Sequence, residues 1–196
     1  MMHITIDAIR NALDARTAVA ASAAGAREAA VALTMAPDAG GRLSILFIKR
    51  AERAGDPWSG QMALPGGRRD RVDATLEDTA RRETLEETGV DLLRGVRLGV
   101  LDDLRPQSRH LPPLVVRPYV FALTDQPPVT ASDEVAFHLW EPVEGLLARR
   151  TEVSIELRGQ TIVTPAYRVH DEIVWGMTER ILTPFLERAV TGGNGR

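Results

Sequence analysis

Residues 66–90 place the strongest constraint on what this chain can fold into. They begin with a glycine pair, continue through a polar loop, and end in a stretch with acidic residues at helical spacing. Thr75 followed by Asp78 resembles a capping box, with Asp in place of the usual Glu. Gly89 suits the left-handed conformation that ends many helices. The segment therefore predicts a helix from about residue 75 to Thr88.

Three acidic side chains share one face of this predicted helix. Glu83, Glu86 and Glu87 project together because residues three and four apart on a helix are neighbours. Carboxylates gathered in this way repel one another, and a hard divalent cation with oxygen ligands removes the repulsion. Mg²⁺, or Mn²⁺ in its place, is the expected cofactor where phosphate oxygens complete the coordination. Arg82 precedes Glu86 by four residues and can brace its carboxylate.

The glycine pair in front of this helix allows backbone to approach a ligand closely. A hard metal beside a phosphate neutralises charge on the phosphoryl oxygens and lowers the pKa of bound water. A carboxylate that is not saturated by metal can then take the proton from that water. The segment predicts metal-assisted hydrolysis of a phosphoanhydride. The alternative is a solvated acidic face in which Arg81 and Arg82 serve as partners four residues away.

The rest of the chain alternates β-prone and helical segments. An amphipathic helix is expected over residues 5–17, within a helical extension of residues 1–27, and a last helix over 178–189, before a mobile tail at 190–196. A short helix is expected over residues 142–147. Strands are expected near residues 28–35, 44–48, 62–64, 94–104, 114–123, 134–140, 152–157, 160–164 and 172–175. The first two strands form a plausible hairpin. This order predicts one α+β domain over residues 1–196, an α/β/α sandwich with a mixed sheet between helices.

Composition narrows the class of partner. The net charge of −3 provides no general basic field for long nucleic acid. The chain has no cysteine, which excludes disulfides and thiolate metal sites and fits a reducing, cytoplasmic location. Its start lacks the features of a signal peptide. Residues 18–33 are rich in Ala but include Arg27 and Glu28, so no membrane span is expected.

The segment that begins at Gly67 resembles the Nudix box, written G-x5-E-x7-R-E-U-x-E-E-x-G-U with U apolar. The box residues Arg-Glu, Glu-Glu and Gly-Val match at 82–83, 86–87 and 89–90. The first acid is out of step, because the box position falls on Ala74 and the nearest acid is Asp73. The loop is one residue longer than the general pattern, so Asp73 is the expected fifth polar partner. The resemblance implies the Nudix fold and hydrolysis of a nucleoside diphosphate linked to another moiety.

The longer loop and the flanking sequence resemble the coenzyme A pyrophosphatase branch of this family. Similar pieces are Phe47-Ile48-Lys49-Arg50, the run from Gly60 to Gly67, the strand entry at 114–119 and Glu134-Val135. Leu64 replaces the Phe of that branch, and Asp56 stands where it has Arg. These departures keep ADP-ribose, dinucleotide polyphosphates and nucleoside triphosphates open as alternative substrates. A nucleotide-binding module without catalysis is the alternative of another class.

The resemblance also assigns roles to residues. Glu83, Glu86 and Glu87 are implied metal ligands, and Glu83, Glu87, Arg82 and Glu134 are candidates for the catalytic set. Glu134 is equally interpretable as an ordinary loop acid. Arg50 and Arg68 are candidate phosphate clamps because the guanidinium fork matches phosphate oxygens. Gly66 and Gly67 are expected to face the substrate, and Trp58 is expected either to cover the pocket or to pack. A homodimer is implied by resemblance to family members.

Overall fold

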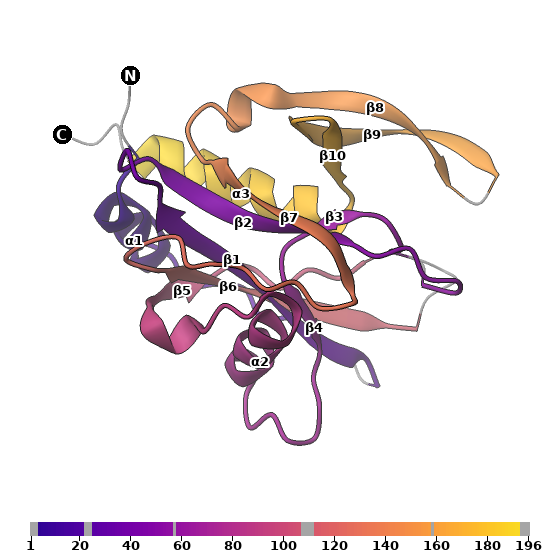
Figure 1. Ribbon diagram of the computed structural model, residues 1–196, viewed down its shortest axis with the longest axis horizontal. Coiled ribbons are helices and arrows are strands. Elements are labelled where there is room, and N and C mark those ends of the chain that lie inside the picture. Colours follow the sequence, from indigo (N-terminus) through magenta and orange to yellow (C-terminus); the bar gives the residue numbers. More distant parts are fainter. Residues whose placement is uncertain (1–3, 22–24, 57, 107–111, 158, 193–196) are drawn as a thin grey trace.

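A mixed sheet lies between helices in the computed structural model, which describes residues 4–21, 25–56, 58–106, 112–157 and 159–192 (Figure 1). The helices are α1 (Ile6–Asp14), α2 (Leu76–Thr88) and α3 (Met177–Gly192), with short 3₁₀ turns η1 (Leu92–Arg94) and η2 (Leu147–Arg149). The main sheet contains β1 (Arg27–Pro37), β2 (Leu43–Arg50), β3 (Met62–Ala63), β4 (Gly66–Arg68), β5 (Val96–Val100), β6 (Leu114–Ala122) and β7 (Val135–Pro142). A second sheet contains β8 (Arg150–Leu157), β9 (Gln160–Val169) and β10 (Glu172–Trp175). The predicted α+β sandwich is confirmed.

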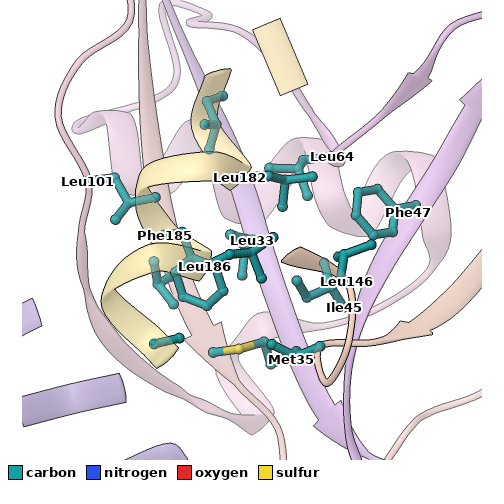
Figure 2. Packing of buried hydrophobic residues seen from close by; sticks show 14 of the residues in the cluster. Leu33, Met35, Ile45, Phe47, Leu64, Leu101, Leu146, Leu182, Phe185 and Leu186 are labelled. Atoms are coloured by element: carbon teal, nitrogen blue, oxygen red, sulfur yellow. The ribbon is translucent and has the colours of Figure 1, made fainter. Parts of the chain in front are cut away.

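Strand β1 is central because both of its faces meet hydrophobic layers. Successive side chains of a strand point to opposite faces. Ala30 and Ala32 belong to the layer that packs under α2, whereas Leu33 and Met35 belong to the layer beneath α3. Figure 2 shows Leu33 among the side chains of α3 and β2. The small residues on one face of β1 allow α2 to lie close to β1, and so to β4, the neighbouring strand that carries the glycine pair.

The expected hairpin of the first two long strands is present but partial. β1 pairs antiparallel with β2 only where Met35–Pro37 face Leu43–Ile45. Nearer its start, β1 pairs with β4, and Gly67 lies opposite Ala30. On its other side β1 runs parallel to β6. The divergence of β2 thus makes room for β4, which brings the glycine pair into the centre of the sheet.

Helix α2 begins and ends where its local signals predict. Thr75 accepts a hydrogen bond from the Asp78 amide, and the Asp78 carboxylate accepts from the Thr75 amide, which completes the capping box. Gly89 has a φ of 70° and closes the helix with its N–H donated to the Leu85 carbonyl. These two ends fix the bounds of α2, and its acidic residues at 83, 86 and 87 all lie inside them.

Several predicted elements differ from the structure. The helix expected at residues 142–147 is a turn followed by η2, and the strand expected at 94–104 is shortened to β5 because η1 precedes it. The strand expected to stop at residue 164 continues through Pro165 to Val169. Pro165 is tolerated because β10 joins β9 only from Ala166 onward, so the missing N–H costs no ladder bond on that side.

The ends of the chain also depart from the expected boundaries. Of the helical extension predicted over residues 1–27, α1 occupies Ile6–Asp14, and the described residues that follow it are not helical before β1 begins at Arg27. α3 continues to Gly192, into the tail expected to be mobile, and residues 193–196 lie outside the described residues. No helix in the described part of the chain is long and apolar enough to span a membrane.

Leu33→Ala is expected to lower the free energy of unfolding by about 3 kcal/mol, because it leaves a cavity where a fully buried side chain lay. Chemical denaturation followed by circular dichroism measures the change. Leu93→Ala is the matched control, since Leu93 is 75% exposed, and it should change stability by less than about 0.5 kcal/mol. Equal losses in the two variants would contradict the assignment of the core.

Candidate active site

The glycine pair is required by close contacts on both sides of β4. Gly66 has a φ of 150°, and a Cβ there would lie 2.3 Å from the carbonyl oxygen of Ala30 in β1. A Cβ on Gly67 would lie 2.4 Å from the carboxyl carbon of Glu83. The N–H of Gly66 donates to Glu87 Oε2 at 2.9 Å. The two glycines therefore let the backbone pass between the sheet and two carboxylates of α2.

Arg82 is the hub of the polar network on α2. Its guanidinium donates to both carboxylate oxygens of Asp73, with Nε and one terminal nitrogen each at 2.9 Å. The other terminal nitrogen lies 2.9 Å from Glu86 and 3.0 Å from Glu83. A further bond of 3.1 Å reaches the carbonyl of Arg68 at the end of β4. One side chain thus ties the loop, the glycine strand and the acidic helix together, and the predicted brace to Glu86 is present.

Asp73 anchors this hub from inside the loop. Its side chain is buried and also accepts from the Thr79 hydroxyl and the Asp70 amide. The hydrogen bonds from Arg82 hold the pKa of Asp73 well below its usual range, despite burial. Asp73, and not Ala74, therefore joins the four polar box residues of α2 through Arg82, as the residue count in the loop predicts.

Two glutamates of α2 face inward and are poorly solvated. Glu87 is 4% exposed, and burial raises its pKa to about 7, against the opposing effects of the Gly66 amide and Arg50. Burial also raises the pKa of Glu83, although Arg82 favours its ionised form. Glu134 adds to both shifts by repulsion. Glu83, Glu87 and Glu134 therefore form one electrostatically coupled acidic group.

These acids line a cavity of about 590 Å³. The candidate substrate-binding residues Arg50, Arg68, Trp58, Gly66 and Gly67 also line it. Arg50 donates two bonds to Asp56, at 2.8 and 3.2 Å, and lies 3.8 Å from Glu87. The structure thus gathers all of the predicted substrate-binding residues at one opening, with Asp56 holding Arg50 beside the buried acid.

Glu86 and Glu134 lie at the margins of this arrangement. The side chain of Glu86 is 58% exposed, pairs with Arg82, and is not part of the cavity wall formed by the described residues. Glu134 is on the wall and pairs with Arg53 at 2.9 Å. Within the described residues, no three side chains of the metal-binding types are gathered as a site. The ligand set of Glu83, Glu86 and Glu87 stays a prediction.

The apolar half of the cavity was not predicted. Its wall includes Leu114 and Val116 of β6 and Met177 and Ile181 of α3. These residues are apolar and distant in sequence from the acidic helix, so their pattern predicts only core. Arg53 also lies on the wall, where it pairs with Glu134. Only the path of β1 and β6 between α2 and α3 brings these residues to one cavity.

Comparison with known proteins identifies the family. Residues 26–158 match the NUDIX domain. The chain belongs to this family. An uncharacterized protein of Schizosaccharomyces pombe is 34% identical over 128 residues, which is 63% of this chain and 39% of that protein. An uncharacterized Nudix hydrolase, NudL, of Yersinia pestis (strain Pestoides F) is 28% identical over 142 residues, or 71% of this chain and 69% of NudL. The Nudix chain thus spans well under half of the yeast relative.

A solved structure supports the same fold. The NUDIX domain of Shewanella oneidensis NrtR, solved in complex with ADP ribose, aligns with a TM-score of 0.54 and 19% identity. The alignment covers 91% of this chain and 90% of that one. The matched domain includes the segment from Gly67 to Val90 that resembles the Nudix box, and NudL is named as a Nudix hydrolase.

Asp73→Asn is expected to lower the free energy of unfolding by about 2–4 kcal/mol near neutral pH, because it leaves Arg82 without its buried anion. A carboxylate whose folded pKa is depressed stabilises the protein above its unfolded pKa of about 4 and loses that effect as pH falls. The gap between wild type and variant should therefore shrink in acid. Denaturant titrations at several pH values measure it, with the exposed Asp171→Asn as control. A gap independent of pH would contradict this role.

Glu87→Gln is expected to stabilise the metal-free protein at alkaline pH. Burial raises the folded pKa of Glu87 to about 7, above its unfolded value of about 4.3. The free energy of unfolding therefore keeps the full contribution of the protonated Glu87 below about pH 4.3 and loses it as the pH rises through about 7. The variant should gain up to about 3 kcal/mol near pH 8 and almost nothing near pH 4. Melting curves in chelator measure this, and Glu152→Gln, at an exposed position, should show no such trend. A destabilised variant at alkaline pH would oppose the assignment.

Proposed function

We propose that this protein is a divalent-metal-dependent Nudix pyrophosphohydrolase that cleaves the diphosphate of a nucleoside diphosphate linked to another moiety. One observation carries the proposal: the buried carboxylate of Glu87 and the half-buried carboxylate of Glu83 lie against the glycine pair and line a cavity whose wall also includes Arg50 and Arg68. Burying acids in this way costs stability, and the cost is typical of a site that binds a cation or moves a proton.

The donor set fits a hard divalent cation. Every candidate ligand is a carboxylate, and two of them have raised pKa values because burial leaves their charge poorly compensated. Glu83, Glu86 and Glu87 would hold Mg²⁺ or Mn²⁺, and the ion would neutralise charge on the diphosphate and acidify a water molecule. Glu86 is paired with Arg82 in the described arrangement, so its side chain must turn to join the other two.

The protein groups have separable tasks in this proposal. Arg82 positions Glu83 and Glu86, and the N–H of Gly66 orients Glu87. A carboxylate among Glu83, Glu87 and Glu134 accepts the proton of the attacking water. Arg50 and Arg68 bind phosphate oxygens, and Trp58 contributes an aromatic surface at the cavity wall.

The cavity favours a substrate with a sizeable uncharged part. Its wall is divided between acidic and basic residues and apolar ones, which include Leu114, Val116, Met177 and Ile181. Coenzyme A or a derivative fits this division, because its diphosphate joins a nucleotide to a long neutral arm. The flanking sequence resembles that branch in part. ADP-ribose, dinucleotide polyphosphates and nucleoside triphosphates are the competing substrates with the same metal chemistry.

A nucleotide-binding module without turnover is the candidate of another class. All three acids of the box helix remain in this chain, which favours the enzyme. We further propose that residues 1–196 act as one catalytic domain, in the cytoplasm as the lack of cysteine suggests, and as a homodimer. Small nucleotide derivatives, and not long nucleic acid or membrane, are the proposed partners.

Incubation of the full chain with Mg²⁺ or Mn²⁺ and a panel of diphosphates tests the activity. Coenzyme A should give 3′,5′-ADP and 4′-phosphopantetheine, resolved by chromatography. Glu87→Gln should lower kcat by about 10²–10⁴, because it removes a candidate base and metal ligand, whereas Glu152→Gln should match wild type. Turnover of another compound in preference to coenzyme A would change the substrate assignment. Binding without any turnover, in folded protein with metal, would favour the binding module.

A further inference from the structure

β8 is a free edge strand on the outside of the second sheet. It pairs with β9 along its length, from Arg150 opposite Tyr167 to Leu157 opposite Gln160. Among the described residues, no strand pairs with its other side. Figure 1 shows the β8–β9 hairpin along the upper edge of the molecule, with its turn end at the far right. The backbone N–H and C=O groups that point outward from β8 are therefore available to another strand.

The outer half of this hairpin is a two-stranded ribbon, because β10 joins β9 only at residues 166–169. Such a ribbon is marginally stable in water without further packing. One face of it carries Val153 and Ile155, with Ile162 opposite Ile155. Natural edge strands are usually protected by charged side chains, especially Lys, or by Pro or a bulge. β8 has no Lys, no Pro and no bulge, and its charged side chains, Arg150, Glu152 and Glu156, are of both signs.

We propose that β8 pairs antiparallel with β8 of a second copy of this chain, in the register that places Val153 opposite itself. Residues opposite one another in an antiparallel pair both turn their backbone groups toward the partner, or both away. This orientation alternates from one residue to the next along a strand. When a strand pairs with a second copy of itself, the two-fold axis must therefore pass through a residue, and not between two residues. The registers centred on Val153 and on Ser154 each pair seven residues of β8, and every other centre pairs fewer.

Charge distinguishes these two registers. A pair centred on Ser154 opposes Glu152 to Glu156 twice. Like charges directly opposite one another are destabilising. The register centred on Val153 instead sets Arg150 opposite Glu156 twice and Glu152 opposite Ser154. The sequence of β8 is therefore self-complementary in one of its two longest registers.

The side chains required by this register are in position. Arg150 is held by Glu179 at 3.0 Å, yet its side chain is 44% exposed and can bind a second carboxylate. Glu156 is exposed and accepts a hydrogen bond from Thr161 across the hairpin. On the opposite face, Val153 would meet Val153 of the second copy, which joins the β-branched residues of both hairpins into one surface. A second copy would thus provide hydrogen-bond partners for the outer backbone groups of β8, opposite charges for Arg150 and Glu156, and an apolar contact for Val153.

Sedimentation velocity of the full chain over a range of concentrations tests this interface. Wild type is expected to dimerise reversibly. Glu156→Lys should raise the dimer dissociation constant by at least about tenfold, because it opposes Arg150 twice. Glu152→Lys is the matched control on the same strand and face, and it should change the constant by less than about threefold because its partner is Ser154. A monomer at all concentrations, or equal effects of the two variants, would overturn the proposal.

The lack of cysteine in the chain permits a second, direct test. Val153→Cys should form a disulfide-linked dimer under mild oxidation, because the two new thiols would meet on the symmetry axis. Val163→Cys is the control, since Val163 is 66% exposed but lies on β9, away from the pairing edge. Circular dichroism confirms that each variant is folded. Crosslinking of the Val163 variant as fast as the Val153 variant would contradict the register.

Discussion

The ion pair between Arg82 and Asp73 supports the parts from which the site is built. It is the contact through which the loop after β4, the end of β4 and the acidic face of α2 share one guanidinium. Asp73 is buried, so the pair is shielded from solvent and its geometry is fixed. The remaining donors of Arg82 are directed at Glu83 and Glu86. The extra loop residue therefore shifts the anchoring acid without changing the chemistry displayed on the helix.

The backbone of β4 and the ends of α2 explain how the fold can keep Glu87 in an unfavourable place. A buried carboxylate at the sheet surface is tolerated because the backbone of Gly66 donates to it and the rest of α2 is fixed at both ends. Side chains larger than hydrogen at Gly66 or Gly67 would collide with β1 or with Glu83. Stability is thus given up at one position and supplied by the surrounding capping and ion-pair contacts, as in many active sites.

Features encoded over short stretches of sequence were predictable. The capping box at Thr75, the end at Gly89 and the shared face of the acids follow from helix geometry, and each is present. Long-range pairing was not predictable in the same way. Nothing near β2 signals that it diverges from β1 to admit β4. Pro165 indicates the end of a strand unless it is known that β10 does not pair with β9 at that residue. The apolar half of the cavity was missed for the same reason.

The cavity is built by two parts of the chain that meet only in three dimensions. Arg68 of β4 and Glu83 and Glu87 of α2 contribute charged groups to its wall, whereas Leu114 of β6 and Met177 and Ile181 of α3 contribute apolar ones. Substitutions in the second group can reshape the space around a ligand while the Arg82 network stays intact. Under the proposed function, such a division separates the residues that carry the reaction from those that shape the space for the substrate. It also marks β6 and α3 as the segments to randomise when a new specificity is sought.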